Sequence, residues 1–149
     1  MRRVDFDKVS VHRTPEESPG YLLWRVSTRW RRAIEEVLKP LKLTHPQFVV
    51  LAVTSWLTRT GEKASQAEIA RHAGLDPNTT SQVLRGLQAK GPVERPRSID
   101  ERSKYPVLTE KGSRLLEKAL PAVEGADAKF FAVLDLKKTG LLSALQKLT

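Results

Sequence analysis

The chain has 149 residues, 40% of them hydrophobic, which suits one compact domain or two interlocked small ones and leaves little room for a separate catalytic domain. Because it contains no cysteine, a disulfide framework, a thiolate nucleophile, a thiolate metal site and a cysteine-based redox sensor are all excluded. Its 26 Lys and Arg against 17 Asp and Glu leave a net charge of +9, which favours a polyanionic partner, nucleic acid before membrane, although a merely soluble basic surface would show the same balance.

The first long helix is predicted to begin at Pro19, with Ser18 as its N-cap. Apolar residues then recur at helical spacing and form one broad stripe, with Trp24 and Tyr21 outside it. A tryptophan outside the stripe indicates a second partner for this helix. The stripe consists of Leu22, Leu23, Val26, Trp30, Ala33, Ile34, Val37, Leu38 and Leu41.

A second helix is predicted to follow the capping-box pair of Thr44 and Gln47. Its residues are apolar nearly all round, a pattern typical of a central, buried helix. Thr60 and Gly61 are expected to end it. The apolar residues are Phe48, Val49, Val50, Leu51, Ala52, Val53, Trp56 and Leu57.

Two further helices follow in a pattern typical of a helix-turn-helix. A second capping box, Ser65 with Glu68, opens a short helix that Gly74 ends. Asp76 then caps a longer helix that has Pro77 at its first position. The few residues between the two helices are too few for antiparallel packing.

A small β-hairpin, or wing, is predicted after these helices. Pro92 stops the second of them, and residues 93–97 and 105–108 form two short extended runs around a polar loop. Pro96 and Pro106 each remove a donor from the strand ladder, so both are expected at strand ends or on an outer edge. The wing is therefore expected to be short or irregular.

The C-terminal part is predicted to form two helices. Thr109 caps a long one, in which Pro121 is expected to cause a kink. A last helix follows Asp135, and it is too apolar for a tail in water, so it is expected to pack against a second copy of the chain; a satellite core within one chain stays open. Its apolar residues are Leu136, Leu141, Leu142, Leu145 and Leu148.

Three segments, taken together, resemble the MarR family of transcriptional regulators. They are LTHPQF at 43–48, SQAEIARHAGLDPNTTSQVLRGLQAKG at 65–91, and DER at 100–102 followed by LTEKG at 108–112. The resemblance implies a mainly α fold with a small β-wing: a winged helix-turn-helix over residues 43–109, and a dimerisation region made of residues 1–42 and 110–149. Pro92, Pro96 and Pro106 depart from the family's pattern.

The helix from Asp76 to Lys90 is predicted to be the recognition helix. Gln can read adenine, Arg can read guanine, Thr can touch the thymine methyl group, and small hydroxyls reach phosphates. An ordinary solvated helix surface would show similar residues. The predicted DNA-contacting residues of this helix are Asn78, Thr79, Thr80, Ser81, Gln82 and Arg85.

The wing is expected to add further contacts. The resemblance implies that Arg102 at its tip enters the minor groove, and that Asp100 orients the wing through an ion pair. Arg97 and Lys104 are also predicted to contact DNA. A solvated turn is the alternative.

The resemblance also implies a crevice between the dimerisation helices and the DNA-binding region that binds small aromatic or phenolic anions. Trp24, His45, Phe48 and Trp56 are the candidates to line it. The alternative is that they are ordinary core residues.

No catalytic residue, metal site or cofactor is predicted. His12, His45 and His72 are far apart, and none has a carboxylate at metal-ligand spacing. A phosphate-binding glycine loop and a nucleophile elbow are both absent from the sequence. Because no stretch reaches the ~18 apolar residues of a membrane span, and the N-terminus lacks an apolar signal core, no membrane partner is expected and the predicted location is cytoplasmic.

The sequence therefore predicts a homodimeric, sequence-specific DNA-binding transcriptional regulator that reads a pseudo-palindromic operator on double-stranded DNA. Repression is the expected effect, and activation stays open. A small aromatic ligand would release it. The alternative is a winged-helix module for protein interactions without specific DNA binding. A small hydrolase is disfavoured by the missing catalytic set.

Overall fold

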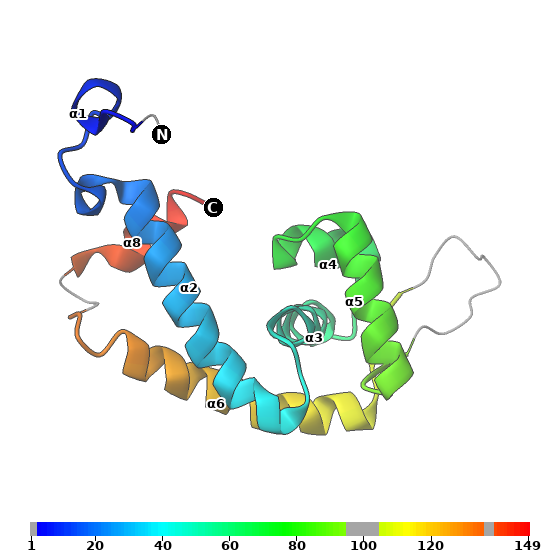
Figure 1. Ribbon diagram of the computed structural model, residues 1–149. Helices are drawn as coiled ribbons and strands as arrows, with labels where there is room; N and C mark the ends of the chain where they lie inside the picture. Colours follow the sequence, from blue (N-terminus) through cyan, green and yellow to red (C-terminus); the bar gives the residue numbers. More distant parts are fainter. Residues whose placement is uncertain (1–2, 95–104, 136–138) are drawn as a thin grey trace.

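Two long helices form an arm that projects from a lobe of three shorter helices (Figure 1). The computed structural model describes residues 3–94, 105–135 and 139–149. The described elements, in chain order, are α1 (Phe6–Val9), η1 (Pro15–Glu17), α2 (Pro19–Leu38), η2 (Lys39–Leu41), α3 (His45–Thr58), α4 (Gln66–Ala73), α5 (Pro77–Lys90), β1 (Val93–Glu94), β2 (Val107–Leu108), α6 (Glu110–Phe130) and α8 (Leu141–Gln146). Helices α2 and α6 pack along each other in the arm, and α3, α4 and α5 make up the lobe.

Local capping explains where the helices begin. Side chains accept hydrogen bonds from backbone N–H groups at the predicted positions, and both capping boxes are complete. The predicted helix starts are thereby confirmed. The capping residues are Ser18 for α2, Thr44 for α3, Ser65 for α4, Asp76 for α5 and Thr109 for α6.

One hydrophobic core joins the arm to the lobe. Fully buried side chains come from α2, α3, α4, α5 and α6, so the lobe cannot rotate freely on the arm without exposing apolar surface. The largest apolar ones in these helices are Ile34, Leu38, Val50, Leu51, Ile69, Leu84 and Leu87, and Val93 of β1 joins them.

The start of α6 is tied to the end of α5. The backbone N–H of Thr109 donates to the Pro92 carbonyl at 3.0 Å, and its hydroxyl donates to the Gly91 carbonyl at 2.6 Å. The same hydroxyl accepts from the backbone N–H of Gly112 at 3.1 Å. A Cβ at Gly112 would lie 2.0 Å from the Pro92 carbonyl oxygen, so only glycine allows α6 to approach this closely.

The base of the wing is a two-stranded antiparallel ladder. Val93 pairs with Leu108, and Glu94 pairs with Val107. Pro106 is buried immediately before β2, which agrees with its expected place at a strand end. Pro96 belongs to residues 95–104, which lie outside the described residues.

The burial pattern corrects one expectation about α3. Trp56 was predicted within a helix buried on all sides, but its side chain is 62% exposed. The Arg59 guanidinium lies 3.7 Å from the centre of its ring, so the indole packs under a cation at the surface. Helix α6 continues through Pro121, where the kink stays a prediction.

The far end of the arm is apolar and uncovered within one chain. Leu142 is 65% exposed, and the other large apolar side chains of this end are also open to solvent. At 65% and 40% exposure, Leu142 and Leu145 of α8 do not form a satellite core within one chain, whereas Leu141 is partly buried and Leu136 lies outside the described residues. The exposed residues are Phe6, Val9, Tyr21, Leu22, Leu23, Trp24, Val26, Leu142, Leu145 and Leu148. No helix in the described ranges is both long enough and apolar enough to traverse a bilayer.

Candidate DNA-binding interface

The turn between α4 and α5 sets the direction of the predicted recognition helix. Gly74 ends α4 with a φ of 64°, a conformation that favours glycine. The backbone N–H of Leu75 then donates to the Ala70 carbonyl at 3.0 Å, and Asp76 caps α5 directly afterwards. The two helices are thus joined by a turn of a few residues, as the sequence predicts.

Helix α5 has a buried side and a polar, exposed side. Leu84 and Leu87 are fully buried and hold the helix against the lobe. The side chains of Asn78, Gln82 and Arg85 are exposed on the other side, spaced four and three residues apart, so they share one face.

The remaining predicted contacts of α5 differ in their exposure. Thr79 and Ser81 are partly buried at the border of the exposed face. Thr80 is completely buried, and its hydroxyl donates to the Asp76 carbonyl at 2.9 Å. Its prediction as a DNA contact was wrong, because it lies four residues before Leu84 and shares the buried side of the helix.

The N-terminus of α5 carries a fixed negative charge. Hydrogen bonds from the hydroxyl and the backbone N–H of Thr79 lower the pKa of the Asp76 carboxyl, so it is ionised at neutral pH. Because the Thr79 hydroxyl donates to Asp76, its methyl group and oxygen lone pairs remain for other contacts. The Nε of Arg85 donates to the Ser81 carbonyl at 3.3 Å, which leaves its terminal nitrogens for a ligand.

The predicted DNA contacts of the wing fall outside the part of the chain that the structure describes. Arg97, Asp100, Arg102 and Lys104 all lie outside the described residues. At the described base of the wing, the Lys63 ammonium lies 5.5 Å from the centre of the Tyr105 ring. Sequence patterns did not single out Lys63, because no spacing rule relates it to a strand more than forty positions later.

The structure separates the four candidates for the crevice. Trp24 is 70% exposed on α2, and Trp56 is exposed at the end of α3. Phe48 is buried in the core. His45, at the start of α3, meets Trp30 edge to face, with ring centres 5.0 Å apart.

A contact that the sequence did not reveal completes the surroundings of His45. The indole Nε1 of Trp30 donates to an Asp127 carboxylate oxygen at 2.6 Å and so joins α2 to α6. Partial burial, followed by the nearby Arg31 guanidinium, lowers the pKa of His45. The neutral imidazole therefore prevails at pH 7 and has one N–H donor.

A helical lobe with an antiparallel wing, and a helix whose polar face is turned outward, define a winged helix-turn-helix protein. The family model described as "ArnR1-like, winged-helix domain" matches residues 39–124. The HTH-type transcriptional regulator YdcH of Bacillus subtilis is 38% identical over 135 residues, which cover 90% of this chain and 91% of YdcH. A solved structure of a MarR family protein, 37% identical over 88% of this chain, adds to these matches, and the chain belongs to the MarR family of winged helix-turn-helix transcriptional regulators.

Solved structures agree with this assignment. The Mycobacterium tuberculosis MarR family protein Rv2887, in a crystal structure with DNA, is 35% identical, covers 88% of this chain and 97% of its own, and has a TM-score of 0.67. The same protein in complex with p-aminosalicylic acid is 37% identical, with coverages of 88% and 98% and a TM-score of 0.67. CouR from Rhodococcus jostii, bound to p-coumaroyl-CoA, is 27% identical, with coverages of 92% and 95% and a TM-score of 0.78.

Proposed function

We propose that the chain is a homodimeric transcriptional repressor that binds a pseudo-palindromic operator. The observation that carries this proposal is that α5 is buried on one side and is polar and exposed on the other. Its apolar side is fixed in the core, and its polar side, with Asn78, Gln82 and Arg85, is free to enter a major groove. The DNA complex of the related Rv2887, which is named a transcriptional repressor, supports it.

The individual contacts follow from side-chain chemistry. Gln82 and Arg85 suit base edges, because an amide matches adenine and a guanidinium matches guanine in the major groove. Thr79 and Ser81 suit phosphate oxygens or a thymine methyl group. The wing contacts that the family resemblance implies, centred on Arg102, complete the proposed interface.

The dimer is proposed from the uncovered apolar end of the arm. Exposed leucines on α2 and α8 form a surface that a stable monomer does not leave in water. A two-fold axis through this surface would present two copies of α5 to one duplex, with half-sites about one helical turn apart.

Release by a small aromatic anion is proposed at the surroundings of His45. The N–H of His45, together with the neighbouring Trp30 ring, suits an aromatic carboxylate. The complexes of Rv2887 with salicylic acid and p-aminosalicylic acid support this ligand class. The ligand would bind with different affinities to dimers whose lobe spacing fits DNA and to dimers whose lobe spacing does not. It would thereby shift the population away from the DNA-binding form.

Selection of bound duplexes from a random pool tests the proposed function. We expect enrichment of an inverted repeat, with an affinity that falls steeply as salt rises because several phosphates are contacted. A pool that shows no enriched sequence after repeated rounds would contradict sequence-specific binding and favour a protein-interaction module.

A further inference from the structure

A cavity lies away from the exposed face of α5, where the arm meets the lobe. It has a volume of about 620 Å³, within the ~300–1,000 Å³ range of small-molecule sites, and it lies between η2, the end of α5 and the start of α6. Its lining residues are Leu41, Lys42, Leu43, Lys90, Pro92, Glu110, Lys111, Arg114, Leu115 and Lys118.

This cavity is distinct from the surroundings of His45. Asp127 follows Lys118 by nine residues on α6, which is about two and a half helical turns, so the two side chains leave opposite sides of the helix. None of the residues assigned above to DNA or to an aromatic ligand lines the cavity.

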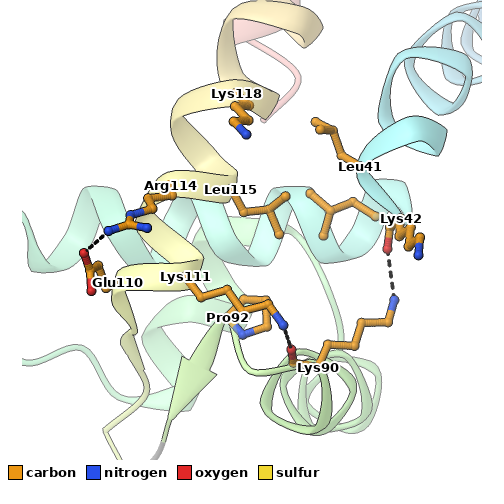
Figure 2. A pocket seen from close by; sticks show the side chains of 10 residues that line it. Leu41, Lys42, Lys90, Pro92, Glu110, Lys111, Arg114, Leu115 and Lys118 are labelled. Atoms are coloured by element: carbon orange, nitrogen blue, oxygen red, sulfur yellow. Dashed lines mark hydrogen bonds and ion pairs between the residues drawn. The ribbon is translucent and has the colours of Figure 1, made fainter.

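The apolar part of the cavity is aliphatic. Leu41 and Leu115 lie toward its middle from opposite sides, and Pro92 lies below them (Figure 2). Leu43 completes this part, and no aromatic ring belongs to the described lining. Such a surface suits a flexible aliphatic body, because it offers no ring on which an aromatic ligand would stack.

The polar part of the cavity carries an excess of positive charge. Glu110 is the single acid in the described lining, and it pairs with Arg114. This leaves four ammonium groups that have no acidic partner among the described residues. They belong to Lys42, Lys90, Lys111 and Lys118.

Two of these ammonium groups are already held in place. Lys90 Nζ donates to the Lys42 carbonyl at 3.0 Å and to Gln47 Oε1 at 3.1 Å, and Lys111 Nζ donates to the Lys90 carbonyl. All three acceptors are neutral, so the positive charge is oriented but not compensated; Figure 2 draws the two bonds to lysine carbonyls. An oriented cation loses less conformational entropy when an anion binds to it.

We propose that this cavity binds an amphiphilic organic anion, with a carboxylate or phosphate headgroup among the lysines and an aliphatic body between Leu41 and Leu115. The headgroup gains charge-assisted hydrogen bonds and relieves the repulsion between like charges. The body removes apolar surface from water. The proposal does not depend on the proposed function, because it requires no contact with DNA.

Calorimetric titration of the full-length protein, in the absence of DNA, tests the site with four probes. Octanoate and octyl phosphate carry both features, octanol lacks the charge, and inorganic phosphate lacks the chain. We expect at least one of the first two to bind about tenfold or more tightly than both octanol and inorganic phosphate. The tighter of the two identifies the headgroup.

A matched pair of variants localises the binding. Lys118→Ala removes an exposed lysine of the cavity and should weaken binding about tenfold, the effect of one lost charge-assisted hydrogen bond. Lys39→Ala makes the same change of charge at a neighbouring exposed lysine outside the lining and should have little effect. Equal binding of octanol and the anions, or equal losses in both variants, would overturn the proposal.

Discussion

Substitution of Gly112 by alanine tests the close approach between the end of α5 and the start of α6. The added Cβ would lie 2.0 Å from the Pro92 carbonyl oxygen, whereas such contacts essentially never fall below 3.0 Å, so the two segments must separate by about 1 Å. Overpacking of this kind costs about 1–3 kcal/mol. The movement also weakens the bond from Thr109 to the Pro92 carbonyl, worth about 1 kcal/mol.

The better helix propensity of alanine offsets about 0.5–1 kcal/mol of this loss. We therefore expect Gly112→Ala to lower the free energy of unfolding by about 1–3.5 kcal/mol. The measurement is urea denaturation at one fixed protein concentration, because assembly of the chain would make stability depend on concentration.

A second glycine of the same helix provides the control. A Cβ at Gly125 would meet no atom within 4 Å, so Gly125→Ala should raise the free energy of unfolding by about 0.5–1 kcal/mol. If Gly112→Ala were as stable as the natural protein, the close approach of α6 to Pro92 would be wrong.

Three further predictions concern DNA reading, pH and assembly. Gln82→Ala should weaken operator binding by about 1–3 kcal/mol and relax the preference at one base pair. Gln88→Ala, which changes an exposed glutamine near the other end of α5, should do neither, so equal losses of affinity in a gel-shift series would exclude Gln82 as a residue that reads a base. Burial lowers the pKa of His45 in the folded state, so the unfolded chain binds more protons below the unfolded pKa of about 6.5. The contribution of His45 to the free energy of unfolding should therefore be fully present above that pH and should fall as the pH drops through it. His45→Gln should reduce the difference in stability between denaturation curves at pH 7 and pH 5, and an unchanged difference would refute the role of His45. Leu142→Glu should dissociate the proposed dimer in sedimentation experiments, whereas Ser143→Glu on the same helix should leave it assembled. If both variants stayed dimeric, α8 would not belong to the interface.

The local features of the fold could be predicted from the sequence. The N-caps at Thr44, Ser65 and Asp76 involve groups within three residues of one another, so their chemistry is visible in a short segment. The same holds for Gly74, whose left-handed conformation ends α4.

Features that depend on packing between distant segments could not be predicted in this way. Trp56 belongs to a helix that is apolar nearly all round, so periodicity does not identify its exposed side. Trp30 and Asp127 are 97 positions apart, and only the pairing of α2 with α6 brings them together. Thr80 is different, because its spacing from Leu84 already indicated the buried side.

Thr109 connects the end of α5 to the start of α6. Its hydroxyl donates to the Gly91 carbonyl and accepts from the backbone N–H of Gly112, and its own backbone N–H donates to the Pro92 carbonyl. With these bonds intact, we expect α5 and α6 to move as one rigid body. In the proposed dimer, a tilt of the arm would then move α5 with it. A ligand would control DNA binding through the distance between the two copies of α5 rather than through a change of shape within either copy.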